Sequence, residues 1–134
     1  MVTPRPDEVA ALLRSGSGDG IWLPVDGVSM LPTISAGSEV WVTSRTRRPR
    51  IAEVWAFCDA NSTIVVHRYR RRDPAGRFVF RGDNVRRADA AVDAAQLVGI
   101  VTRVRRSGAT TTVGLGARVS WLGRRLAARL RRQP

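Results

Sequence analysis

The sequence predicts a mainly β protein whose short antiparallel strands form a barrel or a sandwich. Two observations predict this class. Short segments rich in β-branched and aromatic residues recur at nearly regular intervals between residues 21 and 113, and turn-forming residues such as glycine, proline and aspartate separate them. Such spacing is typical of all-β domains. The 134 residues, 43% of them hydrophobic, have the length of one domain with a single core.

The segment before residue 21 is expected to form a short helix and a linker. Val9, Leu12 and Leu13 share one face of a helix over residues 6–15, and a glycine follows as a stop signal. Glycine, serine and aspartate then make a flexible turn. We therefore separate residues 1–20 from the β domain.

The strands are predicted from runs of β-branched and aromatic residues. Residues 21–25 and 39–43 flank a loop that contains a serine, and residues 53–57 follow a basic loop with a proline. Residues 63–71 make a longer fourth strand, and the composition of residues 72–77 predicts a turn into a fifth. The full set of expected strands is residues 21–25, 39–43, 53–57, 63–71, 78–81, 97–105 and 110–113.

The C-terminal segment is expected to form a basic amphipathic helix. Leucine and valine recur there at spacings of three and four, and arginines surround this apolar stripe. Such a helix packs on its own domain, lies on an anionic bilayer or docks a partner protein. We expect residues 115–132 to make one of these three contacts. The expected organisation is therefore residues 1–20, the β domain over 21–113, and the helix over 114–134.

The basic charge of the chain comes entirely from arginine. The 23 arginines outnumber 11 acidic residues, which gives a net charge of +12 and no lysine at all. This charge fits a solvated surface, an anionic membrane, an acidic peptide or a nucleic acid. One tyrosine and three phenylalanines are few for stacking on single-stranded bases. We therefore expect no nucleic-acid partner, and a non-catalytic basic binding module is kept as an alternative.

Several classes of protein are excluded by what the sequence lacks. No apolar run approaches the roughly 18 residues that span a bilayer, and early acids and prolines replace the apolar region of a secretory signal. We expect a cytoplasmic or peripheral membrane protein. Cys58, the only cysteine, has no metal-ligand spacing around it and is interpreted as a core residue. No metal or cofactor is expected.

Ser29 is the first candidate catalytic residue. Gly27 allows a bend before it and Pro32 disfavours a helix after it, so that the serine hydroxyl and N–H can face one point. A serine hydroxyl needs an adjacent base to act as a nucleophile at neutral pH. Because the chain has no lysine, this base must be His67, the only histidine, or a carboxylate. An ordinary polar turn between two strands is the alternative.

His67 is the second candidate. Strand alternation puts Val65, His67 and Tyr69 on one face of the expected fourth strand. Its imidazole is either a structural residue of this strand or a general base that works near neutral pH. Such a base needs an orienting carboxylate. Asp83 and Asp89, which both follow the next strand, can fold back to supply it.

Five segments resemble, in order and spacing, the boxes of the type I signal peptidases and LexA-like serine peptidases. The serine box of that superfamily reads roughly G-x-S-M-x-P-T. In its endoplasmic-reticulum and archaeal branch a histidine replaces the usual lysine, which agrees with a chain that has none. The similarity covers about residues 21–105. The matching segments are residues 27–33 (GVSMLPT) with 37–42 (GSEVWV), 53–57 (EVWAF), 66–69 (VHRY), 81–84 (RGDN) and 96–101 (QLVGIV).

The resemblance implies a signal-peptidase-like β fold. The chain departs from signal peptidases in one respect, because we expect it to lack their N-terminal membrane anchor. The resemblance also implies a serine endopeptidase that cleaves a leader or signal-like peptide in trans through an acyl-enzyme. The peptide is expected to bind as an extended strand. The implied site residues are Ser29 as nucleophile, His67 as general base, Asp89 or else Asp83 to orient His67, and Gly27, Val28, Met30 and Pro32 beside the substrate.

A LexA-like regulator that cleaves itself is the second enzymatic alternative. It needs a DNA-binding domain and a cleavable linker before the serine box. The residues before Ser29 contain no helix-turn-helix pattern and no Ala-Gly or Cys-Gly bond. We therefore expect cleavage of a separate substrate.

Overall fold

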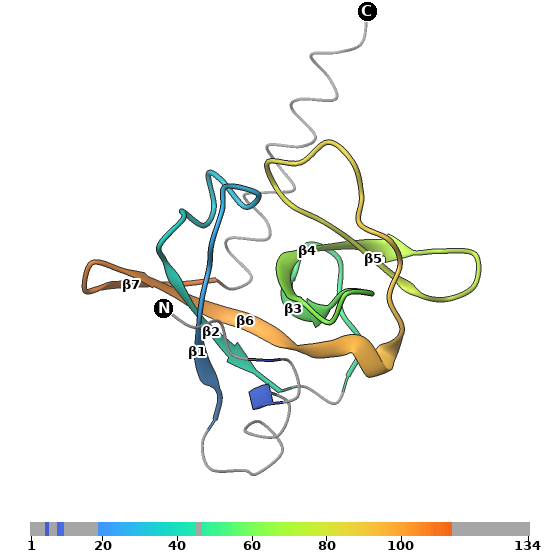
Figure 1. Cartoon of the computed structure of the whole chain (residues 1–134), viewed down its shortest axis with the longest axis horizontal. Coiled ribbons are helices and arrows are strands. Elements are labelled where there is room, and N and C mark those ends of the chain that lie inside the picture. Colours follow the sequence, from blue (N-terminus) through green and yellow to red (C-terminus); the bar gives the residue numbers. More distant parts are fainter. Residues whose placement is uncertain (1–4, 6–7, 10–18, 45–46, 114–134) are drawn as a thin grey trace, which may run out of the picture.

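The protein folds as one strongly bent antiparallel β-sheet (Figure 1). The computed structural model describes residues 5, 8–9, 19–44 and 47–113. The mainly β class predicted from the sequence is confirmed. The elements are β1 (Ile21–Pro24), β2 (Glu39–Thr43), β3 (Val54–Cys58), β4 (Ile64–Arg72), β5 (Phe78–Arg81), the 3₁₀ turn η1 (Ala94–Gln96), β6 (Leu97–Arg106) and β7 (Ala109–Thr112).

The strand order is β1-β2-β6-β3-β4-β5, and β7 pairs with β6. The long strand β6 joins the two halves of the sheet because it changes partner along its length (Figure 1). Its first residues pair with β3 and its last with β7, while β2 pairs along the other edge. A barrel requires its end strands to pair, but β1 and β5 do not pair with each other. The barrel expected as one alternative is therefore not formed, and the sheet is open.

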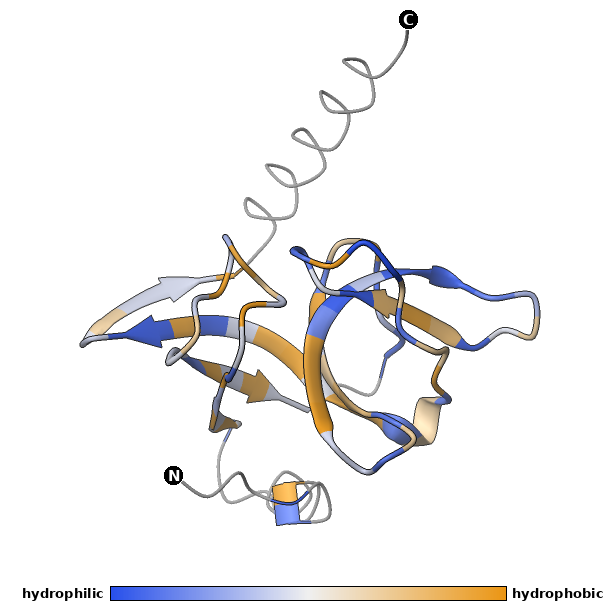
Figure 2. Ribbon diagram, turned by 45° about the horizontal axis from the view of Figure 1, so that its top comes forward, coloured by the Kyte–Doolittle hydropathy of each residue, from blue (hydrophilic) through white to orange (hydrophobic). Residues whose placement is uncertain are grey.

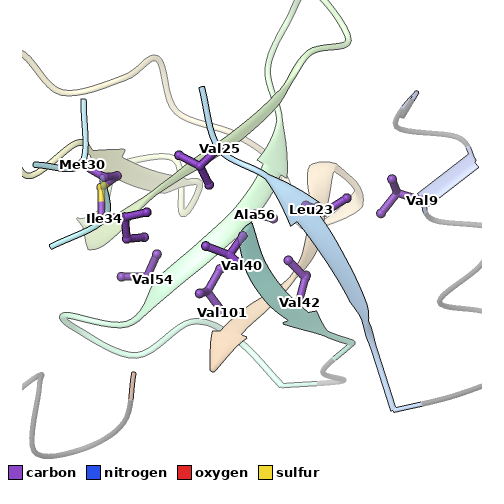
Figure 3. Packing of buried hydrophobic residues seen from close by; sticks show 10 residues of the cluster. All are labelled: Val9, Leu23, Val25, Met30, Ile34, Val40, Val42, Val54, Ala56 and Val101. Carbon is purple, nitrogen blue, oxygen red and sulfur yellow. The ribbon is translucent and has the colours of Figure 1, made fainter. Parts of the chain in front are cut away.

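Two clusters of buried side chains lie on opposite faces of β3. Strand alternation sends Val54 and Ala56 into an aliphatic cluster, and Trp55 and Phe57 into an aromatic one. β3 is therefore buried on both faces. The aliphatic cluster, drawn in Figure 3, consists of Val9, Leu23, Val25, Met30, Ile34, Val40, Val42, Val54, Ala56 and Val101. The aromatic cluster consists of Trp55, Phe57, Tyr69, Phe78, Phe80, Val92 and Ile100.

Each strand predicted from the sequence is present, and its ends differ from the prediction by at most one residue. The hairpin between β4 and β5 is a mostly hydrophilic protrusion (Figure 2), as expected from its arginine and turn residues. The polar connection over residues 84–95 contains the start of η1 and a bridge between Phe78 and Val92.

Most of the two predicted helices lies outside the described residues. Of the segment 6–15, only residues 8 and 9 are described, and Val9 is buried in the aliphatic cluster. The expected helix over residues 114–134 lies wholly outside them. Among the described residues, no helix has the length and apolar character needed to cross a membrane.

Glu53, just before β3, is a buried acid that holds the preceding arginine loop. Its carboxylate accepts two hydrogen bonds from the Arg47 guanidinium at 2.6 and 2.9 Å, one from the Arg50 N–H at 2.7 Å and one from the Trp55 indole at 3.3 Å. Burial raises the pKa of Glu53, but these hydrogen bonds and the charge of Arg47 outweigh it and lower the pKa below its ordinary value.

Glu53→Gln is expected to lower the free energy of unfolding by about 1–3 kcal/mol at neutral pH, because it removes charge-assisted hydrogen bonds from a buried group. A lowered pKa stabilises the fold above the unfolded carboxyl pKa of about 4.3, and this contribution is lost as the pH falls through the folded-state pKa. Urea unfolding should therefore show a difference between wild type and Glu53→Gln that shrinks in acid. A difference that persists unchanged in acid would contradict this role.

Candidate active site

Ser29 lies in the loop between β1 and β2, and buried residues on either side anchor that loop. The Val25 N–H donates to the Ser38 carbonyl at 2.8 Å, and Met30 and Ile34 pack into the aliphatic cluster. Gly27 has φ of +78°, a left-handed conformation that favours glycine. The loop therefore turns sharply and leaves Ser29 half-buried at the surface.

His67 lies in β4 and connects Ser29 to Asp89. Its Nε2 is 3.0 Å from the Ser29 Oγ, and its Nδ1 is 2.5 Å from an Asp89 carboxylate oxygen. The imidazole is buried beside the Phe57 ring, with ring centroids 6.3 Å apart. The Asp89 N–H donates to the Phe80 carbonyl at 2.9 Å, which fixes this part of the connection beside β5. Three residues far apart in the sequence thus form a continuous hydrogen-bonded row.

The order of this row suits proton transfer from the serine. A carboxylate beside Nδ1 favours the tautomer that carries its proton there. In that tautomer Nε2 is free to accept the proton of the Ser29 hydroxyl, and Asp89 stabilises the imidazolium that results. The arrangement has the geometry of a Ser-His-Asp triad.

Asp83, the other carboxylate considered for orienting His67, has different partners. It accepts hydrogen bonds from the Arg68 Nε at 2.9 Å and Nη2 at 2.7 Å, and from the Thr33 hydroxyl at 2.5 Å. Strand alternation explains the division, because the neighbours His67 and Arg68 point to opposite faces of β4. Asp83 therefore ties the serine loop to β4 through Arg68, whereas Asp89 orients the histidine.

Of the four residues expected beside the substrate, the structure leaves only some accessible. Gly27 and Val28 are exposed next to Ser29, Val28 by 56%, and Pro32 is exposed further along the loop. Met30 is only 1% exposed because it packs in the aliphatic cluster. Its side chain therefore anchors the loop from below, and a contact between Met30 and substrate stays a prediction.

A cleft of about 310 Å³ runs past Ser29 and His67. It is lined by residues 24–26 at the end of β1, by Ser29, and by residues 63–67 at the start of β4. On the side away from β3, residues 64–67 have no strand partner among the described residues, because pairing with β5 begins at Arg68. This open edge can accept an extended peptide as an added strand.

Asn84 has a role that sequence reasoning did not assign. Its side-chain amide donates to the Val28 carbonyl at 3.1 Å, and its N–H donates to the Ser29 carbonyl at 2.8 Å. The Val28 carbonyl and the Ser29 N–H belong to one planar peptide group and point in opposite directions. Asn84 therefore fixes the direction of the Ser29 N–H, the natural donor to an oxyanion. The sequence feature that could have indicated this role is the position of Asn84 directly after Asp83.

Gly82 is a second residue of the site that sequence reasoning did not assign. The backbone there passes very close to Ser29 and His67. A Cβ at this position would lie 2.6 Å from the Ser29 carbonyl oxygen and 3.0 Å from the His67 Nε2. The first distance is too short for a carbon atom beside backbone, and the second is tighter than an ordinary van der Waals contact. Only glycine therefore allows the chain to carry Asp83 and Asn84 to the serine loop without displacing it.

Gly82→Ala is expected to lower the reactivity of Ser29 by about 100-fold or more, because a shift of about 1 Å between reacting groups has that effect. Gly108→Ala is the matched control: Gly108 has φ of +81° and open space around its Cα. The control should lower the melting temperature while the folded protein keeps its reactivity. Equal reactivity of the Gly82→Ala and wild-type proteins would contradict the described close approach.

Among the residues that the structure describes, no group of three His, Cys, Asp or Glu side chains is arranged to hold a metal ion.

Compared with known proteins, the chain matches no family model and no curated sequence.

Proposed function

We propose that this protein is a serine endopeptidase of the signal-peptidase and LexA-like type, of the branch that uses histidine as the base. The observation that carries the proposal is the hydrogen-bonded row of Ser29, His67 and Asp89 beside an open strand edge. The segments that resemble this superfamily support it, since they contain Ser29 and His67.

In the proposed reaction the Ser29 oxygen attacks the carbonyl carbon of the scissile peptide bond while His67 takes the serine proton. The Ser29 N–H, held in direction by Asn84, donates to the oxyanion that forms. His67 then gives the proton to the leaving amine as the C–N bond breaks. Water, deprotonated by His67, hydrolyses the acyl-enzyme and restores the serine hydroxyl.

The proposed substrate is a leader or signal-like peptide that binds in trans as an extended strand. The unpaired edge of β4 at residues 64–67 supplies backbone groups for such a strand, and the cleft leads it to Ser29. At about 310 Å³ the cleft lies at the small end of ligand pockets, which favours small side chains near the scissile bond.

The proposal is tested by digesting a defined library of peptides and identifying the products by mass spectrometry. Wild-type protein should yield cleavage products that are absent with Ser29→Ala. Ser35→Ala is the matched control, because Ser35 lies in the same loop and is also half-buried. The same products from Ser29→Ala as from wild type would assign the cleavage to another source and overturn the proposal.

A further inference from the structure

The cleft at Ser29 and His67 differs in charge from three other clefts of the described chain. It contains no arginine, although 23 of the 134 residues are arginine, and its one acidic side chain is that of Asp26. Its other lining residues are mostly aliphatic. Three other clefts are all basic, and the arginines that line them are Arg47, Arg48, Arg70, Arg71, Arg72, Arg77, Arg81 and Arg86.

Asp26 is held at the mouth of this cleft by its neighbours in the chain. Val25 is buried, its N–H donates to the Ser38 carbonyl at 2.8 Å, and its carbonyl accepts from the Gly37 N–H at 3.0 Å. Gly27 then turns the chain toward Ser29. Asp26 is exposed, and within the described part of the chain it forms no ion pair despite the many arginines. Its carboxylate is therefore available to a ligand.

We propose that Asp26 is a specificity residue that selects a substrate with an arginine or lysine in the stretch that lies in the cleft. The inference rests on the proposed function and names its substrate class: a peptide of small and aliphatic residues with one basic side chain near the scissile bond. A guanidinium or ammonium group of the substrate pairs with the Asp26 carboxylate, and the aliphatic wall contacts its neighbours. The arginines that line the three other clefts are positively charged and cannot pair with a basic group of the substrate.

The test measures binding, so that it does not depend on turnover. Ser29→Ala protein is titrated into fluorescent peptides that carry arginine at one position, or citrulline, its neutral near-isostere, and the position is scanned along the peptide. The titration is then repeated with the double variant Ser29→Ala with Asp26→Asn. Asp19→Asn is the matched control, because Asp19 is another exposed aspartate outside the cleft.

We expect arginine to bind about two- to fivefold more tightly than citrulline at one position, the size of effect typical of an exposed ion pair. The preference should vanish with Asp26→Asn and persist with Asp19→Asn. Absence of a preference at every position, its survival in Asp26→Asn, or absence of peptide binding would overturn the inference.

Failure of this inference is distinguishable from failure of the proposed function. Covalent labelling of Ser29 in wild-type protein without any charge preference overturns the role of Asp26 alone. A charge preference that depends on Asp26, in a protein whose Ser29 is unreactive, leaves the selective cleft in place and overturns the peptidase.

Discussion

Replacing His67 by alanine is expected to slow the acylation of Ser29 by roughly 10⁴- to 10⁶-fold. The His67 Nε2 lies 3.0 Å from the Ser29 Oγ. Among the described residues it is the only basic nitrogen in contact with that hydroxyl. Without it the serine must react as a neutral alcohol. The rate is measured with a peptidyl phosphonate, which bonds covalently to an activated serine.

Two further variants separate a chemical role of His67 from a structural one. Asp89→Asn keeps the side-chain shape but no longer favours the productive tautomer, and it should slow labelling by about 10⁴-fold. Imidazole added to His67→Ala should restore part of the rate, which a purely structural loss would not allow. Labelling of His67→Ala within tenfold of the wild-type rate would contradict its role as the base.

Replacing Asp83 by alanine is expected to lower the free energy of unfolding by about 3–5 kcal/mol, because it leaves a charged guanidinium buried without its partner. Arg68 and Asp83 are 1% and 4% exposed at their side chains, and two hydrogen bonds join them. Arg68 also donates to the Ala52 carbonyl at 2.7 Å, so it cannot turn outward without losing that bond as well. The change is measured by urea unfolding.

Two controls give this result its meaning. Glu39→Ala breaks the exposed pair with Arg105 and should cost less than about 1 kcal/mol. The double variant Arg68→Met with Asp83→Leu removes both charges, and it should recover much of the stability lost in Asp83→Ala. A double variant that is less stable than Asp83→Ala would contradict the account, because it would mean that the pair itself, rather than an orphaned charge, decides the cost.

Much of the local structure could be predicted because it depends on neighbours in the sequence. The strands follow from runs of β-branched and aromatic residues, and alternation along β4 separates His67 from Arg68. Because the two side chains point to opposite faces of β4, one aspartate can contact His67 and the other can contact Arg68. Residue types alone could not decide which aspartate contacts His67 and which contacts Arg68, because this depends on the path of the chain after β5.

The openness of the sheet and the support of the site could not be predicted in this way. Register shifts interrupt the β2–β6, β3–β6 and β4–β5 pairings, and such irregularities bend strands and alter twist. Whether the end strands β1 and β5 pair depends on the combined effect of these register shifts. The close approach of Gly82 and the two hydrogen bonds of Asn84 likewise join segments more than fifty residues apart. Such contacts exist only once the chain is folded.

Whether Ser29 is an activated nucleophile is tested most directly by the site of covalent labelling by the peptidyl phosphonate. Intact-protein mass spectrometry counts the adducts, and fragment mapping locates them, in wild type, Ser29→Ala and Ser35→Ala. We expect a single adduct on Ser29 of the wild-type and Ser35→Ala proteins, and none in Ser29→Ala. A folded wild-type protein whose Ser29 stays unmodified from neutral to alkaline pH would contradict this expectation.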